Sequence, residues 1–333
     1  MILISISFDD GHQGQYSEVL PILQKAGMKA TLYNSPVHIG ATDVTYPRMT
    51  LDTVKLLYAA GWDMGIQQYN DTTDVPINTP GTNQLTNDGA GNYTWINGSN
   101  RDHNLTSGNS IIIKGSQEPE FNGTFTVATT PNAYTFTFTG PVTANTTAHG
   151  QISCPRPDKG IQEWKNDIES VRTFYRSNGM PRGLDHIAYS NGVYNLDYLD
   201  IVNSMGILTG RTTSVGTAPT ARMFDGRMTN YKSLLDIPVT YSFDQGTAST
   251  ALGYVDLAEA NQCHCLIYAH AVLPGVGVGL AQCSDTTEWQ KLIFGDGSTG
   301  LRGLWERQQT GRVRVVTISE MYRNLKTSFR SAA

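Results

Sequence analysis

The chain starts with an apolar run that ends in two acidic residues. Residues 1–6 read Met-Ile-Leu-Ile-Ser-Ile, and the string Ser-Phe-Asp-Asp-Gly follows over Ser7–Gly11. A continuous apolar run that is rich in β-branched residues and stops at a glycine predicts a strand inside a parallel sheet. Sites in such sheets lie beyond the carboxyl ends of the strands. Asp9 and Asp10 are therefore candidates for chemistry, and an Asp-Asp-Gly turn that only caps the next helix is the alternative.

Apolar positions on both flanks of the chain alternate between strand spacing and helix spacing. Helical spacing predicts helices over residues 17–27, 50–61, 161–179 and 196–206. Ser17 and Thr50 are the expected N-caps of the first two, and Gly27 and Gly61 are their expected ends. A short strand is expected over residues 30–33. Strands that alternate with helices of this length predict a parallel α/β fold.

Residues 72–154 break this alternation. The stretch is rich in Asn, Thr and Gly, and β-type runs lie over residues 110–114, 124–127 and 134–139. Alternating Phe and Thr in the last run is typical of a strand with one buried face. We therefore expect an inserted all-β domain over residues 76–153, with residues 1–75 and 154–333 together forming an α/β domain.

Composition narrows the classes of partner. The 333 residues carry 24 Lys and Arg against 29 Asp and Glu, a net charge of −5, and no basic block. This balance argues against a nucleic-acid partner. No apolar stretch approaches the roughly 20 residues of a membrane span, so no membrane insertion is expected. No signal peptide is expected either, because the first apolar run leads directly into Asp9. The protein is then carried out by another route, or the chain is one piece of a longer one.

Five motifs give the acidic pair a chemical context. They are Ser7–Gly11, Gly61–Asp71, Ile187–Asn195, Leu266–His270 and Val313–Glu320. In this order they resemble the motifs of the NodB-type polysaccharide deacetylases, the carbohydrate esterases of family 4, in which the first motif is usually Thr-Phe-Asp-Asp-Gly. The resemblance extends over residues 1–71 and 155–325. It implies that the α/β fold is a distorted (β/α) barrel.

The resemblance also implies a division of roles. Asp9 would be the general base that activates water, and His270 would be the acid that protonates the leaving sugar atom. Asp10 would bind a metal ion. Asn191 holds the place whose backbone N–H helps to bind the oxyanion, and Tyr189 of the same motif is expected to bind substrate.

The second motif departs from the family at two places. Gln67 and Asp71 stand where the family has two metal-binding histidines. With Asp10 they form a set of oxygen donors, which suits Mg²⁺, Ca²⁺ or Mn²⁺ better than zinc. The resemblance implies a divalent ion, Zn²⁺ in the family, and the altered ligands leave open another ion or an inactive site.

The third motif departs from the family at Ala188, where many members carry an arginine that pairs with the base. Arg211, at the end of the apolar segment over residues 207–210, is expected to supply the missing guanidinium and to contact substrate. The alternative is a surface arginine at a strand end.

Segments Asn104–Asn109 and Asn122–Val127 resemble a small β-module of phage tail and baseplate proteins. With the deacetylase motifs, this leads us to expect removal of acetyl groups from a bacterial surface polysaccharide by metal-assisted water attack. The protein would act in a phage tail spike or fibre at the bacterial cell surface, with acetylated polysaccharide and other tail proteins as partners. The alternatives are a catalytically impaired barrel that binds carbohydrate and a purely structural virion component.

Overall fold

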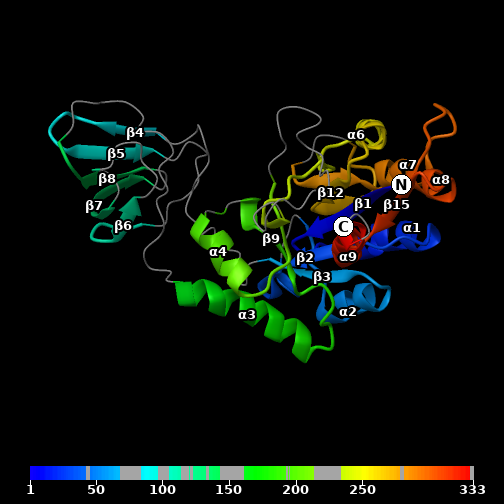
Figure 1. Ribbon diagram of the computed structural model, residues 1–333, viewed down its shortest axis with the longest axis horizontal. Helices are drawn as coiled ribbons and strands as arrows, with labels where there is room; N and C mark the ends of the chain where they lie inside the picture. Colours follow the sequence, from blue (N-terminus) through cyan, green and yellow to red (C-terminus); the bar gives the residue numbers. More distant parts are fainter. Residues whose placement is uncertain are drawn as a thin grey trace. The chain divides into compact units, whose positions relative to one another are not determined.

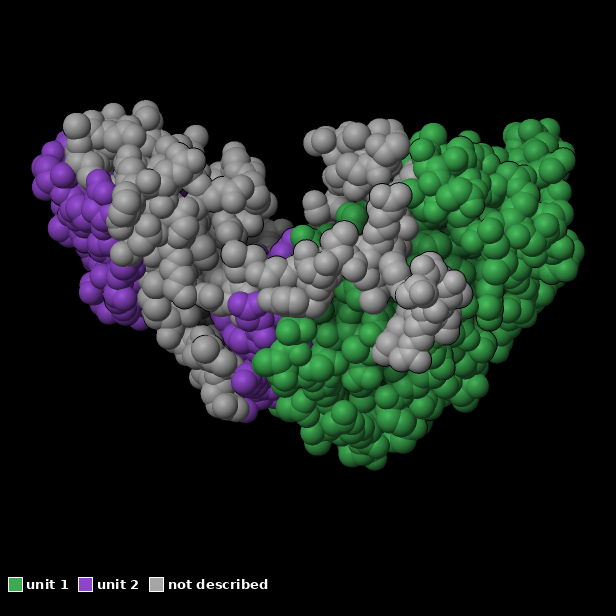
Figure 2. Space-filling model, in the orientation of Figure 1, with its two compact units in different colours: residues 1–71, 167–192, 203–333 green, residues 72–166, 193–202 purple. Residues whose placement is uncertain are grey.

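The computed structural model describes residues 1–42, 46–67, 84–96, 105–113, 120, 123–132, 135–142, 161–192, 194, 196–213, 234–277 and 281–330. The chain divides into two compact units, coloured separately in Figure 2. Unit 1 comprises residues 1–71, 167–192 and 203–333, and unit 2 comprises residues 72–166 and 193–202. The domain limits expected from the sequence, 76–153 for the insert, remain a prediction.

Unit 1 is built on a parallel sheet. Its strands are β1 (Ile2–Asp9), β2 (Thr31–Asn34), β3 (Asp63–Ile66), β9 (His186–Ala188), β10 (Thr209–Arg211), β11 (Tyr241–Ser242), β12 (Cys265–Ala269) and β15 (Val313–Val316). Their order is β10-β9-β3-β2-β1-β12-β11, and β15 pairs with the start of β1 (Figure 1). Every pairing in this sheet is parallel.

The two ends of this sheet are joined through the segment that leads into β11. Ile237 forms a parallel bridge with Arg211 of β10, and the N–H of Thr240 donates to Leu266 of β12 at 2.9 Å. The strand pairing therefore continues from β1 through β2, β3 and β9 to β10, and residues 237–240 connect β10 back to β12, which pairs with β1. This curled parallel sheet confirms the expected (β/α) barrel.

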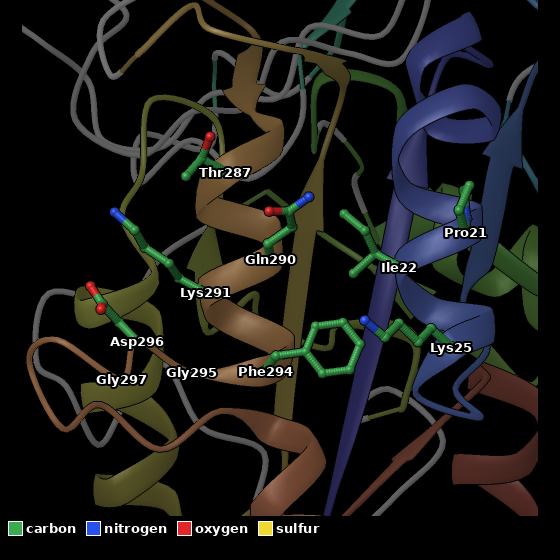
Figure 3. A pocket seen from close by; sticks show the side chains of 10 residues that line it. All are labelled: Pro21, Ile22, Lys25, Thr287, Gln290, Lys291, Phe294, Gly295, Asp296 and Gly297. Carbon is green, nitrogen blue, oxygen red and sulfur yellow. The ribbon is translucent and has the colours of Figure 1, made fainter.

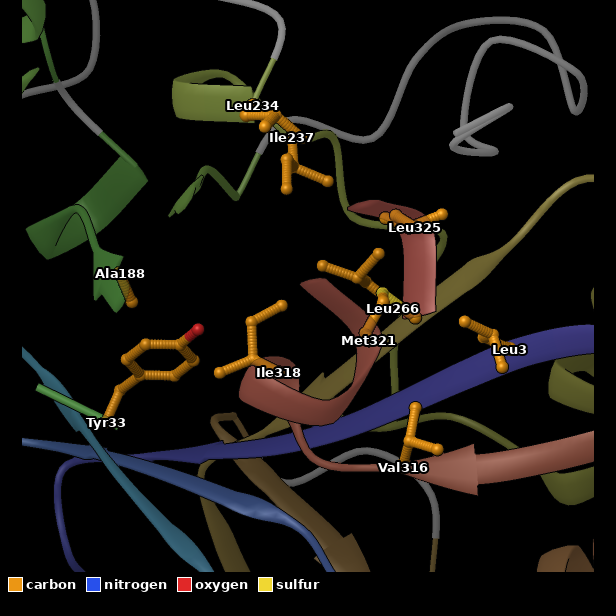
Figure 4. Packing of buried hydrophobic residues seen from close by; sticks show 10 residues of the cluster. All are labelled: Leu3, Tyr33, Ala188, Leu234, Ile237, Leu266, Val316, Ile318, Met321 and Leu325. Atoms are coloured by element: carbon orange, nitrogen blue, oxygen red, sulfur yellow. The ribbon is translucent and has the colours of Figure 1, made fainter. Parts of the chain in front are cut away.

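The two faces of β1 have different partners because side chains alternate along a strand. Leu3 belongs to a buried apolar cluster with residues of β2, β12, β15 and α9 (Ile318–Arg330), shown in Figure 4. On the opposite face, the Phe8 ring stacks on Trp62 with centroids 5.4 Å apart and lies 5.0 Å from Trp289. Asp9 lies an even number of residues after Leu3, so its side chain is on the same face of β1 as Leu3. Because both faces of the strand are packed against other elements, the position of the Asp9 carboxylate is fixed.

The helices follow the strands as the alternation predicted. They are α1 (Leu20–Lys25), α2 (Leu51–Ala59), α3 (Ile161–Ser177), α4 (Leu196–Ser204), α6 (Ala248–Asn261), α7 (Thr286–Phe294), α8 (Leu304–Gln309) and α9. Thr50 caps α2, accepting from the N–H of Thr53 at 3.3 Å as expected. Ser17 is not an N-cap. It lies within a π-helical segment, Gln15–Val19, that continues into α1, and its hydroxyl donates to the carbonyl of Gln13. None of the described helices is both long and apolar enough to cross a membrane.

Unit 2 contains a five-stranded antiparallel sheet with its own apolar core. The strands are β4 (Gln84–Asn87), β5 (Asn92–Ile96), β6 (Ser110–Ile113), β7 (Gly123–Asn132) and β8 (Thr135–Thr139), in the order β4-β5-β8-β7-β6. Phe136 and Phe138 are buried, and the Phe136 ring stacks on Trp95. The strand positions and the buried Phe face agree with the sequence pattern. That the sheet belongs to an inserted domain remains a prediction.

Candidate active site

The candidate residues converge at the carboxyl ends of the parallel strands. Asp9 and Arg211 are the last residues of β1 and β10, and His270 directly follows β12. Gln67 directly follows β3. Because all of these strands run in the same direction, their ends meet at one edge of the barrel. Residues that are far apart in the sequence therefore face one another.

Asp9 and Arg211 form a buried ion pair. Nη2 of Arg211 donates to both carboxylate oxygens of Asp9, at 2.6 and 2.5 Å. The guanidinium lies over the rings of Tyr33 and Tyr268, 5.2 and 4.7 Å from their centroids. Arg211 is only 2% exposed, so the alternative of a surface arginine is wrong. Burial raises the pKa of Asp9 above its usual value, although Arg211 opposes this rise, and a base with a raised pKa accepts a proton more readily.

His270 is oriented by Asp244, which the sequence reasoning missed. Nδ1 of His270 lies 2.6 Å from Oδ2 of Asp244, and the backbone N–H of His270 donates to Oδ1 at 2.9 Å. Nε2 of His270 points toward Asp9 and lies 3.9 Å from Oδ2. Burial alone would lower the pKa of His270, but Asp244 and Asp9 raise it to about 9. The imidazole is therefore protonated at neutral pH, as a general acid must be.

Gln15 ties the ends of β1 and β12 together. Its Nε2 donates to the carbonyls of Asp9 at 2.6 Å and His270 at 2.9 Å. The side chain is fully buried. It therefore holds the backbones of the candidate base and acid at a fixed separation. No pattern in the sequence marks Gln15, because it lies in the helical segment that follows the motif.

Asp10 turns away from the direction of β1. It has a left-handed backbone with φ of 65°, so its carboxylate does not follow the alternation of the strand. Nε2 of Gln67 donates to Oδ1 of Asp10 at 2.7 Å. Burial alone would raise the pKa of Asp10, but the positive charge of His270 and the Gln67 hydrogen bond hold it below its usual value. Asp10 is therefore anionic at neutral pH.

Arg48 and His12 lie on the other side of Asp10. Nη1 of Arg48 donates to the backbone carbonyl of Asp10 at 2.5 Å and lies 4.0 Å from Oδ2. Nε2 of His12 is 3.9 Å from the same oxygen. Burial and the charge of Arg48 lower the pKa of His12 to about 4, so this imidazole is neutral at neutral pH.

The groups around Asp10 do not fit the zinc site that the resemblance implies. Catalytic zinc sites combine imidazole and carboxylate ligands around an open position. Within the described part of the chain, no three His, Cys, Asp or Glu side chains form a group that could hold an ion. Asp10 instead accepts from Gln67 and faces Arg48. Asp71, the third expected ligand, lies outside the described residues, so a divalent ion remains a prediction from the resemblance alone.

The two residues taken from the third motif have different environments. Tyr189 is buried, and its hydroxyl donates to the carbonyl of Leu235 at 2.7 Å. Its hydroxyl is thus already used inside the barrel. Asn191 lies in the short turn Ser190–Gly192 after β9, at the same edge as Asp9. Their roles in substrate binding remain predictions.

A separate hollow of about 570 Å³ lies between α1 and α7, with Lys25 and Lys291 among its lining residues (Figure 3). Neither Asp9 nor His270 lines it. The hollow is therefore separate from the candidate base and acid at the strand ends.

Comparison with known proteins supports the motif assignment. A family model described as polysaccharide deacetylase matches residues 2–74, which include Asp9, Asp10 and Gln67. A comparison with curated protein sequences finds no match.

Solved structures with some similarity include two bacterial proteins and one phage protein. IcaB from Ammonifex degensii is 12% identical over 62% of this chain and 58% of its own, with a TM-score of 0.35. The peptidoglycan deacetylase PdaC from Bacillus subtilis is 8% identical over 99% of this chain and 94% of its own, with a TM-score of 0.44. The endosialidase of phage phi92 is 23% identical over 24% of this chain and 12% of its own, with a TM-score of 0.19.

All of these TM-scores are below 0.5, so the similarity to the deacetylase family rests on the family model and not on the solved structures. The family model agrees with the resemblance of the motifs: residues 2–74, which carry the first motif and the strand of the second, are similar in sequence to the polysaccharide deacetylases.

Proposed function

We propose that the protein removes acetyl groups from a bacterial surface polysaccharide, such as a capsule, an O-antigen or an exopolysaccharide. The observation that carries this proposal is the approach of Nε2 of His270 to Oδ2 of Asp9, at 3.9 Å. A carboxylate beside a protonated imidazole supplies the base and the acid that hydrolysis of an ester or amide requires. The deacetylase family match at the same strand end supports the acetyl group as substrate.

The residues divide the reaction between them. Asp9 takes a proton from water while Arg211 and Gln15 hold its carboxylate and its backbone in place. His270 then donates its Nε2 proton to the sugar atom that leaves. Asp244 accepts from Nδ1–H and keeps that proton in place, so the proton that the imidazolium gives up is the one on Nε2.

The phage context is the finer part of the proposal. It rests on the resemblance of residues 104–109 and 122–127 to a tail module. In this proposal the protein is part of a phage tail spike or fibre at the bacterial surface, with other tail proteins as partners. The five-stranded sheet would then position the polysaccharide or attach the barrel to the tail.

A second candidate function is carbohydrate binding by an impaired barrel. The environment of Asp10, with Gln67 and Arg48 in place of metal-ligand partners, favours this alternative. In it, the barrel would recognise a surface glycan as a receptor without cleaving it.

Acetate release separates the two functions. Purified protein is incubated with acetylated capsular polysaccharides and with their chemically deacetylated forms, and free acetate and glycan binding are measured in parallel. The deacetylase predicts continuous acetate release from the acetylated polymers. Saturable glycan binding without acetate release would establish the binding module and refute the enzyme.

A further inference from the structure

Arg48 lies in a segment that is fastened to the loop after β1. His12 and Arg48 form an antiparallel bridge, and the N–H of Gln13 donates to the carbonyl of Pro47 at 2.7 Å. The Arg48 side chain is 15% exposed. The guanidinium is therefore held in place by backbone pairing beside the acidic motif.

The guanidinium contacts the groups that surround Asp10. Besides the Asp10 carbonyl at 2.5 Å and its Oδ2 at 4.0 Å, Nη1 of Arg48 lies 3.3 Å from Nε2 of His12. Since a guanidinium keeps its charge, this part of the site holds a permanent cation.

Three carboxylates among the described residues of this barrel edge, those of Asp9, Asp244 and Asp10, each have a cationic group nearby. Arg211 pairs with Asp9, and His270 pairs with Asp244. Arg48 faces Asp10. A divalent ion bound to Asp10 would lie close to the Arg48 charge, and like charges at such distances repel strongly at a partly buried site.

The contact of Gln67 with Asp10 also differs from what a metal-binding role of Asp10 would require. The amide N–H of Gln67 donates to Oδ1 of Asp10 at 2.7 Å, so the amide presents a donor and not an acceptor to this carboxylate. The other end of the amide, Oε1, is buried and has no hydrogen-bond partner among the described residues. A water molecule that donates to this oxygen would complete its hydrogen bonding.

We propose that Arg48 takes the electrostatic place of the family's metal ion, so that this barrel hydrolyses acetyl groups without a divalent cation. This inference rests on the proposed deacetylase function. Arg48 is a positioning residue in it: it acts through Asp10, by balancing the carboxylate that would otherwise oppose negative charge on the substrate carbonyl.

The reaction balances with water as the only co-substrate. Water loses a proton to Asp9, and its oxygen bonds to the acetyl carbon while the carbonyl electron pair moves to oxygen. When the oxyanion collapses, the bond from the acetyl carbon to the sugar oxygen or nitrogen breaks. His270 protonates that leaving atom, and acetate departs.

The first test combines chelation with a change at Arg48. Wild-type protein is dialysed against a chelator, its metal content is measured by mass spectrometry, and kcat and KM for acetate release are determined. We expect full activity with no bound metal. Arg48→Met should lower kcat about 10²-fold with a small change in KM, because oxyanion formation loses electrostatic support, and Arg48→Lys should recover part of the loss. Arg302→Met removes an exposed arginine, paired with Glu306, and serves as the matched control with wild-type kinetics.

The second test reads metal binding directly and does not depend on activity. Zinc is titrated by calorimetry into wild-type, Arg48→Met and Asp10→Asn proteins whose folding is checked by circular dichroism. We expect no zinc site in the wild-type that depends on Asp10, and stronger zinc binding once Arg48 is removed.

Two results would overturn the inference. One is stoichiometric zinc in the wild-type that Asp10→Asn abolishes, and the other is acetate release that chelation stops and zinc or another ion restores. Failure of the proposed function looks different, because acetate would then be absent with and without added ions. The zinc titration would still decide the role of Arg48.

Discussion

Two halves of one site retain the family pattern to different degrees. In the base–acid half, made of Asp9, Arg211, Asp244 and His270, a carboxylate and an imidazole face each other, and each has a charged partner. In the Asp10 half, made of Asp10, His12, Arg48 and Gln67, the two expected histidines are replaced and a guanidinium lies beside the carboxylate.

In the proposed reaction, this difference separates two requirements of the chemistry. Proton transfer needs a base and an acid at definite atoms, which are the roles proposed for Asp9 and His270. Electrostatic support for an oxyanion needs positive charge nearby, which a guanidinium as well as a metal ion can supply. Three substitutions and one excision test this division, and the expected effect decreases from the first to the last.

Asp9→Asn should lower kcat for acetate release by about 10³-fold or more, since the amide cannot accept the proton of water. The variant should also unfold more easily, by about 3 kcal/mol, because Arg211 is left as an unpaired buried charge. Kinetics are therefore measured well below its melting temperature, with Asp52→Asn on α2 as the matched control. Wild-type rates in Asp9→Asn would show that Asp9 is not the base and would contradict the proposed roles of Asp9 and His270.

Asp244→Asn should move the alkaline limit of activity to lower pH. Asp244 helps to raise the pKa of His270 to about 9, and the acid form of His270 is lost as pH rises through that value. With the carboxylate gone, the pKa falls toward its ordinary value near 6.5, so activity at pH 8 should drop by up to about 30-fold. At pH 5.5 the variant should approach the wild-type. An equal loss at both pH values would indicate a structural role for Asp244 instead.

Gln15→Leu should lower the free energy of unfolding, and it should reduce the rate of acetate release less than the two preceding substitutions do. Loss of the amide leaves two buried carbonyls without their donor, which costs about 1–3 kcal/mol in the free energy of unfolding. The measurement is chemical denaturation followed by acetate assays. Gln24→Leu, at an exposed position of α1, is the control. If the two variants are equally stable, Gln15 does not hold the strand ends together.

Excision of residues 76–153, with a short Gly/Ser linker, should change the hydrolysis of small acetyl esters least of all. An inserted domain carries its own core, so the barrel should still fold. Activity on polymeric substrate should decrease. An unfolded product would show that the domain limits or the modularity expected from the sequence are wrong. A folded product without activity on small esters would show that residues 76–153 contribute to hydrolysis itself.

The candidate residues that directly follow apolar strands are marked by a local pattern in the sequence. The apolar run before Asp9 and the one before His270 place these residues at the edge of a parallel sheet, and the structure brings them together. Thr50 was identified as a cap because its contact with Thr53 is local. Ser17 had the same local signal, but the helical segment begins before it.

Residues that enter the site from distant loops left no such signal. Arg48 reaches Asp10 from a segment without helix or strand periodicity. Asp244 follows a two-residue strand, which is too short to produce an alternating pattern. Arg48 and Asp244 reach the site because of how the strands of the barrel pair with one another. That pairing depends on contacts between distant parts of the chain and leaves no local pattern in the sequence.

The pH dependence of acetate release by metal-free wild-type protein tests the proposed acid and the proposed independence from metal together. We expect steady release without any divalent ion, with kcat falling above a pH of about 9 as His270 loses its proton. Absence of release from every acetylated polysaccharide, or a rate that is unchanged across that pH range, would contradict this expectation.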